Sequence, residues 1–177
     1  MSGHSKWKQI KEKKGKEDAK RSREFGKLAQ LIAVESRAAG GDVNSPALRT
    51  VIERARAANM PKENIERAVE RGAGTGGATL ESITYETYGP GGTAILIDAV
   101  TDSRNRTNQE LKHLLSDLGY ALAAPGSAAW AFTKDASGAR ISQTSVPLSD
   151  EDTEKLAALV EKLEERDDII HVDTNAE

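Results

Sequence analysis

The sequence of 177 residues contains no cysteine, so disulfide bonds, cysteine-bound metals and a thiolate nucleophile are excluded. It also lacks an apolar run as long as a membrane-spanning helix, which needs about 20 residues. The basic N-terminus is not followed by the apolar core of a signal peptide. We therefore expect a cytoplasmic protein that does not associate with membranes.

Residues typical of catalytic sites are scarce. The histidines, His4, His113 and His171, are far apart in the sequence and lack the spacing of metal ligands. Ser127 in "APGSAAW" lacks the second glycine of a nucleophile elbow. No Gly-Lys-Ser/Thr follows the glycine-rich segment 72–79, which favours a linker over a phosphate loop. The sequence predicts no enzyme, no metal, no cofactor and no small-molecule substrate.

Positive charge is concentrated at the N-terminus, although the whole chain has a net charge of −3. Residues 1–28 contain ten Lys/Arg and four acids, a net charge of +6. Residues 81–177 contain eight Lys/Arg and eighteen acids, a net charge of −10. Such asymmetry indicates a basic arm that faces a polyanion, with a solvated, frayed terminus as the alternative.

The first third of the sequence predicts three helices. The first covers about residues 18–39, and the second is capped by Ser45 and stops near Asn59. The third begins at Pro61 and is ended by Gly72. Their apolar residues recur at helical spacing and are expected to face a common core: Phe25, Leu28, Ile32, Leu48, Val51, Ile52, Ala55, Ile65, Ala68 and Val69.

The remaining residues alternate strands with helices. Apolar runs predict five strands, at 82–88, 93–100, 127–133, 140–146 and 169–172. Thr107 and Glu110 predict a capping box for one helix, and Ser149 caps another. The order ββαββαβ contains a split β-α-β unit of the ferredoxin-like type, preceded by one extra strand.

The fold class is therefore α+β, with an N-terminal three-helix domain followed by a ferredoxin-like α+β domain. The predicted domains are the basic arm and helical domain at 1–72, a Gly-rich linker at 73–79 and the α+β domain at 80–177. We expect a monomer.

The basic arm and the start of the first helix form the candidate nucleic-acid site. If the helix extends backward, its basic residues at spacings of three and four lie on one stripe, away from the face of Phe25 and Leu28. Gly15 and Gly26 weaken such a helix. The candidate contacts are Lys6, Trp7, Lys8, Lys11, Lys13, Lys14, Lys16, Lys20, Arg21, Arg23 and Lys27.

Trp7 has two interpretations. Its indole can stack on an unpaired base while the neighbouring lysines hold phosphates. Alternatively, Trp7 and Ile10 fold back and fix the arm onto the helical domain. Both can hold in different states.

A second polar cluster, "TDSRNRT" at 101–107, follows a predicted central strand and precedes a helix. Free backbone N–H groups and arginines there can bind an anion, so Arg104, Asn105 and Arg106 form a possible secondary anion site. In the alternative interpretation, Asp102 and Asn105 organise the turn and the arginines pair with nearby acids.

Six motifs in order resemble the YebC/PmpR family, which includes the mitochondrial translational activator of cytochrome oxidase. The similarity runs from Gly3 to Phe132 and resumes at 141–168. The motifs are "GHSKW" (3–7), "DAKR" (18–21), "AANMPKENIERA" (57–68), "YGPGG" (88–92), "TDSRNRT" (101–107) and "GSAAWAF" (126–132).

The resemblance implies a helical N-terminal domain followed by α/β domains, no catalytic activity, and a nucleic-acid surface that includes the arm from Lys6 to Arg23. Members are described as DNA-binding transcriptional regulators and as ribosome-associated factors that relieve stalling. Members usually carry a further small domain between the segments matching Phe132 and Ile141, where this sequence has only residues 133–140. The function that such a domain supplies is therefore in question.

Three functions follow as hypotheses. The favoured one is an RNA-directed factor on the ribosome that contacts rRNA through the arm. The second is a DNA-binding transcriptional regulator, although no helix rich in Arg, Asn and Gln stands out. The third is a protein-interaction module in which the acidic α+β domain binds a basic partner.

Overall fold

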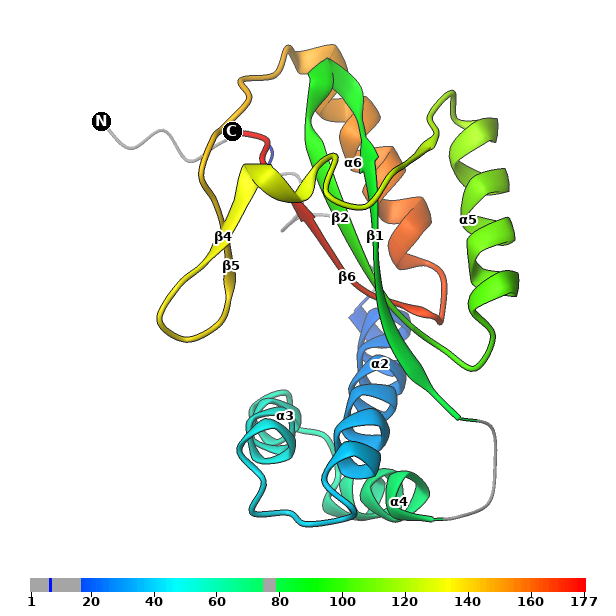
Figure 1. Cartoon of the computed structure of the whole chain (residues 1–177), viewed down its shortest axis with the longest axis vertical. Coiled ribbons are helices and arrows are strands. Elements are labelled where there is room, and N and C mark those ends of the chain that lie inside the picture. Colours follow the sequence, from blue (N-terminus) through cyan, green and yellow to red (C-terminus); the bar gives the residue numbers. More distant parts are fainter. Residues whose placement is uncertain (1–6, 8–16, 75–78) are drawn as a thin grey trace. The chain divides into compact units, whose positions relative to one another are not determined.

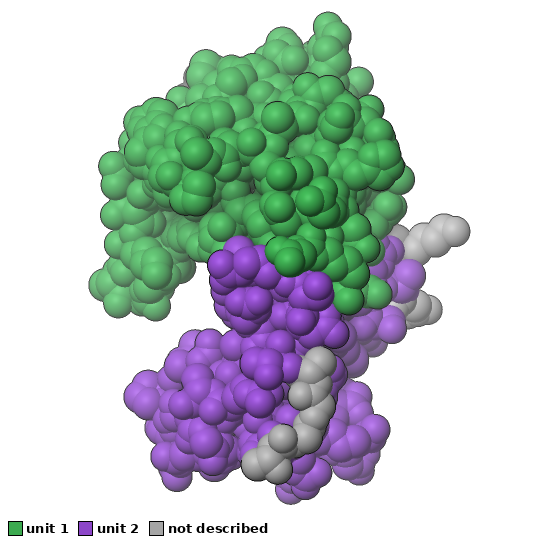
Figure 2. All heavy atoms as spheres, turned by 45° about the vertical axis from the view of Figure 1, so that its right-hand side comes forward, with its two compact units in different colours: residues 1–15, 84–99, 105–177 green, residues 16–83, 100–104 purple. Residues whose placement is uncertain are grey.

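The computed structural model describes Trp7 and residues 17–74 and 79–177. The chain divides into two compact units, coloured in Figure 2. The helical unit comprises residues 16–83 and 100–104, and the α+β unit comprises residues 1–15, 84–99 and 105–177. Most of the predicted linker lies outside the described residues, so the predicted domain boundaries stay predictions.

The helical unit consists of α2 (Glu17–Ala38), α3 (Pro46–Ala57) and α4 (Lys62–Ala73), together with the first residues of β1 (Figure 1). The three predicted helices are confirmed to within two residues at each end. Their buried apolar residues form one core, because the 3.6-residue period places them on facing sides: Leu28, Ile32, Leu48, Ile52, Ala55, Met60, Ile65 and Ala68.

Gly72 has a different role from the predicted one. It lies inside α4, which continues to Ala73, and it is buried against α2. A Cβ atom at this position would lie 2.2 Å from the carbonyl oxygen of Ala33 and 2.7 Å from the Cβ of Ser36. The glycine therefore allows close approach of the two helices, and the Ser36 hydroxyl bridges them by donating to the carbonyl oxygen of Val69 at 2.7 Å.

The α+β unit is built on a four-stranded sheet in the order β3-β1-β2-β6. Its strands are β1 (Glu81–Tyr88), β2 (Ala94–Thr101), β3 (Leu122–Ala123) and β6 (Ile169–Thr174). Between β2 and β3 runs α5 (Arg104–Asp117), so β1 is inserted between the two strands that α5 connects. This arrangement agrees with the predicted α+β class and split β-α-β unit.

One face of this sheet packs on α5 and α6 (Asp150–Glu164). Ile95 and Ile97 point to this face, and alternate residues of β2 point to the other, as the period of two requires. The predicted N-cap of α6 is confirmed, since the Ser149 hydroxyl accepts from the N–H of Asp152 at 3.1 Å.

The predicted strands 127–133 and 140–146 are much shorter in the structure. Residues 129–131 form a short 3-10 helix, η2 (Ala129–Ala131), before β4 (Phe132–Lys134) pairs with β5 (Arg140–Ser142) in a separate two-stranded sheet. The predicted polar turn joins them as an antiparallel hairpin. The fourth strand of the main sheet is instead β3, which has only two residues and too little pattern to be predicted.

The second face of the main sheet carries a polar network centred on Arg140. Its guanidinium donates to Asp98 of β2 and, at 3.0 Å, to Asp173 of β6. The Thr84 hydroxyl of β1 donates to Asp98 at 2.6 Å and accepts from the Arg140 guanidinium at 3.2 Å. The hydrogen bond and charge of Asp98 raise the pKa of Arg140 against the opposing effect of burial, with Asp173 adding to them. The β4–β5 hairpin is thereby fixed to three strands.

Candidate nucleic-acid interface

The described part of the predicted basic stripe lies on α2. Lys20, Arg21 and Arg23 are exposed on its first turns, whereas Lys27 is half-buried and takes part in an interaction with its surroundings. The positions of Lys20, Arg23 and Lys27 in a continuous helix place them on one stripe, as predicted. This stripe is compatible with a line of phosphate contacts.

The opposite side of α2 explains why these cations face solvent. Leu28 and Ile32 are buried in the helical core, and Phe25 packs partly against it. The apolar stripe thus fixes the rotation of α2 and leaves Lys20 and Arg23 on the outer side. Arg21, four residues before Phe25, lies in line with the apolar stripe and is exposed at the start of the helix.

The remaining arm cations lie outside the described residues, so their roles stay predictions. They are Lys6, Lys8, Lys11, Lys13, Lys14 and Lys16.

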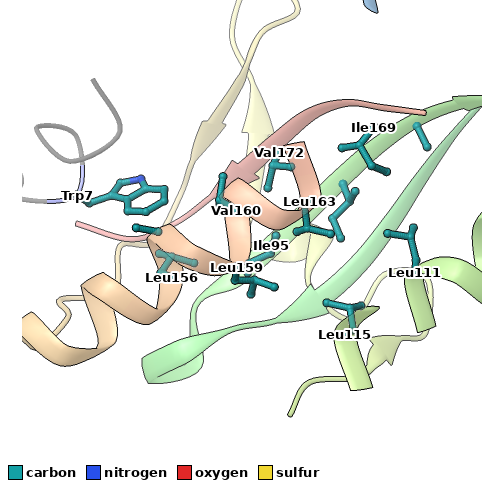
Figure 3. Packing of buried hydrophobic residues seen from close by; sticks show 13 residues of the cluster. Trp7, Ile95, Leu111, Leu115, Leu156, Leu159, Val160, Leu163, Ile169 and Val172 are labelled. Atoms are coloured by element: carbon teal, nitrogen blue, oxygen red, sulfur yellow. The ribbon is translucent and has the colours of Figure 1, made fainter. Parts of the chain in front are cut away.

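Trp7 is buried in the hydrophobic core of the α+β unit, with only 8% of its surface exposed. Figure 3 shows its indole beside the α6 residues Leu156 and Val160. In this position the ring is covered and cannot stack on a base. The fold-back interpretation therefore holds for Trp7 in this structure, with one correction: the ring packs on the α+β unit and not on the helical unit. The helical and strand periodicities of apolar residues in the sequence cannot reveal such a contact, because it depends on residues about 150 positions away.

Two residues of the possible secondary anion site, Arg104 and Arg106, already make contacts within the protein. Arg104 forms an ion pair with Glu81 at 3.0 Å, and Arg106 also has an interaction partner. The capping box is wrong, because α5 begins at Arg104 and Thr107 lies within it. The Thr107 hydroxyl instead donates to Asp168 at 2.8 Å. These contacts favour the local interpretation of the cluster.

Exposed arginines on α3 and α4 were not singled out by the sequence reasoning. Arg54 and Arg56 lie in the last turn of α3, and Arg67 and Arg71 lie on α4. The sequence contains enough information to predict their exposure, since they lie between the buried positions of two amphipathic helices. They extend the set of solvent-facing cations on the helical unit beyond α2.

The α+β unit has the opposite electrostatic character. Its residues 84–99 and 105–177 contain seven Lys/Arg and sixteen acids, a net charge of −9. Six of these acids belong to α6 alone. A surface of this sign repels phosphate groups.

Among the described residues, no group of three or more His, Asp or Glu side chains could hold a metal ion. In the same part of the chain, no helix is long and apolar enough to span a membrane.

Comparisons with known proteins agree over most of the chain. The model of the TACO1/YebC protein N-terminal domain matches residues 5–75, and that of the TACO1/YebC second and third domain matches residues 80–138. A "probable transcriptional regulatory protein" of Petrotoga mobilis is 53% identical over 136 residues, covering 76% of this chain and 54% of that protein. One of Fervidobacterium nodosum is 46% identical over 175 residues, covering 96% of this chain and 68% of that protein.

A solved structure supports the same relationship. The crystal structure of the conserved hypothetical protein Aq1575 from Aquifex aeolicus is 31% identical and has a TM-score of 0.83. The similarity covers 98% of this chain and 97% of that chain. The chain spans about half the length of the Petrotoga relative.

Proposed function

The chain belongs to the TACO1/YebC family, and from this premise we propose that it is a non-enzymatic, nucleic-acid-binding regulator of gene expression. Its target is RNA, ribosomal RNA above all, and the contact is made through the basic arm and the first turns of α2. The observation that carries the proposal is the opposition between exposed cations on α2 and the net charge of −9 on residues 84–99 and 105–177 of the α+β unit.

The charge distribution favours a polarised contact with a large ribonucleoprotein. A protein that lies along a naked duplex presents much of its surface to phosphates, and here most of the α+β surface would be repelled. A protein that enters a ribonucleoprotein at one basic end avoids that repulsion. The RNA proposal is therefore preferred on electrostatic grounds.

A DNA-binding transcriptional regulator is the second candidate, favoured by the names of the relatives. Helices α3 and α4 are joined by only four residues, as in a helix-turn-helix. However, the exposed positions of α4 include Glu63, Glu66 and Glu70, whose carboxylates would face phosphates and base edges. This composition is unlike that of a recognition helix.

The proposal is tested with the triple variant Lys20→Glu/Arg21→Glu/Arg23→Glu. Acidic residues near a helix N-terminus interact favourably with the helix dipole, so α2 should still fold. We expect binding to a fluorescein-labelled single-stranded RNA to weaken by about tenfold or more near physiological salt. The log–log salt slope should become shallower by roughly 2, because about three phosphate contacts are lost.

The matched control reverses three exposed lysines of the acidic unit, Lys112, Lys134 and Lys162, which changes the net charge by the same amount. It should bind RNA nearly as the wild type does. Equal weakening of both triple variants would refute the localised contact. Ribosome co-sedimentation of the two variants tests the ribosomal target, and tighter binding to duplex DNA than to RNA in the presence of random-sequence competitor would instead support the DNA candidate.

A further inference from the structure

Two aromatic side chains of the α+β unit form an exposed, hydrogen-bonded pair. Trp130 is 58% exposed and Tyr88 is 38% exposed, in a chain with only seven aromatic residues. The Trp130 Nε1–H donates to the Tyr88 hydroxyl at 2.9 Å, and that hydroxyl donates to the carbonyl oxygen of Ser127. Both polar groups are thus engaged within the protein, and the pair presents aromatic ring surface to solvent.

The loop that carries Trp130 is held by a buried carboxylate. Glu86, only 8% exposed, accepts hydrogen bonds from the backbone N–H groups of Gly126, Ala128 and Ala129 at 2.7, 2.7 and 2.9 Å. Burial tends to raise the pKa of Glu86, but the three backbone N–H groups together lower it, so the carboxylate stays charged.

The small residues of the same loop complete its attachment. Ala128 and Ala131 are fully buried and pack with Ala94 and Leu96 on the face of the sheet opposite the helices. Trp130, which lies between them in sequence, is held out to solvent by the turn. A side chain fixed in this way loses little conformational freedom when a ligand packs on it.

The α+β unit that carries the pair is acidic. Its residues 84–99 and 105–177 have a net charge of −9. Phosphate groups are repelled there, whereas cations are attracted.

We propose that the Tyr88–Trp130 pair is a docking site for an arginine-bearing, basic segment of a protein partner. A guanidinium stacks flat on an indole face by a cation–π interaction, and the net negative charge of the unit attracts a basic segment. The site lies on the unit that nucleic acid avoids, so the protein can bind RNA through its helical unit and a basic protein segment through its α+β unit. This inference is independent of the RNA contact proposed above.

The probe is a fluorescein-labelled decapeptide of alternating Arg and Gly, measured by fluorescence anisotropy against the full chain. We expect the Trp130→Ala variant to bind it about three- to tenfold more weakly than the wild type does. Replacement of another exposed apolar residue of the unit, Leu118→Ala, should leave the affinity unchanged. A Lys-Gly peptide of equal charge should bind more weakly than the Arg-Gly peptide and depend less on Trp130, since lysine does not stack as a plane.

A direct readout comes from a Trp7→Phe variant, in which Trp130 is the only tryptophan. The Arg-Gly peptide should quench or shift its emission, whereas a decamer of uridine should bind without affecting it. Equal affinity of Trp130→Ala and Leu118→Ala for the Arg-Gly peptide would overturn the proposal. A response of Trp130 emission to oligouridine as large as that to the peptide would also overturn it, and would assign the pair to base stacking. Thermal unfolding of Trp130→Ala verifies that the variant is folded.

Discussion

Trp7 allows the sharpest test of the structure, because its two interpretations predict opposite results for one substitution. The side chain is 8% exposed, and burial of an indole removes roughly 150–250 Å² from water. At about 25 cal/mol per Å² this corresponds to roughly 4–6 kcal/mol, an upper estimate because the unfolded chain is partly compact. We therefore expect Trp7→Ala to lower the free energy of unfolding by about 3 kcal/mol.

For a chain of this size, a loss of about 3 kcal/mol lowers Tm by roughly 6–12 °C. Circular dichroism measures the transition, and the emission of a Trp130→Phe variant, which keeps Trp7 alone, should be blue-shifted as for a buried indole. The matched control is Trp130→Ala, which removes the exposed tryptophan and should change Tm by at most about 2 °C.

A Trp7→Ala variant that keeps the wild-type Tm within 2 °C, about the shift allowed for the exposed control, would refute the burial of Trp7 in the core. If RNA binding falls at the same time, the indole acts at the ligand and not in the core. A fall in Tm with RNA affinity retained would agree with the structure.

Four other substitutions have defined outcomes. Gly72→Ala should destabilise by about 3 kcal/mol in urea unfolding, because its Cβ overlaps backbone of α2, whereas Gly26→Ala, with nothing within 4 Å, should stabilise by about 0.5–1 kcal/mol. Glu86→Gln should cost about 1.5–3 kcal/mol at pH 7, since an amide NH₂ cannot accept from the backbone N–H groups. Because the pKa of Glu86 is lowered, its stabilisation is complete above about pH 5 and is lost as pH falls through the lowered pKa. Urea unfolding of wild type between pH 7 and pH 3 should show this loss, and Glu86→Gln should lack that part of it. Arg140→Met should cost about 2 kcal/mol by leaving Asp98 and Asp173 without their shared cation, and an Arg140→Met variant as stable as wild type would show that the network contributes nothing.

The helices and long strands could be predicted because local periodicity decides them. The spacing of Leu28 and Ile32, or of Leu156 and Leu163, is set by the 3.6-residue turn, and the apolar run of β2 suits a central strand. Their bounds follow from caps and positive-φ glycines such as Gly40 and Gly119.

Features that depend on distant residues could not be predicted. The apolar run at 127–133 resembles a strand, but Glu86, some forty positions earlier, takes the N–H groups that a strand would use and turns the chain at Ala129. The sequence predicts a helix end at Gly72 because glycine commonly ends helices, whereas the close approach of the Ala33 backbone is what requires a glycine there. Of the candidate site, the exposure of Lys20 and Arg23 followed from sequence, whereas the burial of Trp7 required the tertiary fold.

The β4–β5 hairpin has a consequence for the evolution of this chain. Lys134 and Arg140 are paired across it, and the turn between them is closed by hydrogen bonds to Asp135. Any polypeptide spliced in at that turn would leave and re-enter at neighbouring points, with the Arg140 contacts to the sheet intact. A module inserted at this position would therefore leave the core of the α+β unit unchanged, and the same turn is a suitable place to graft a foreign domain.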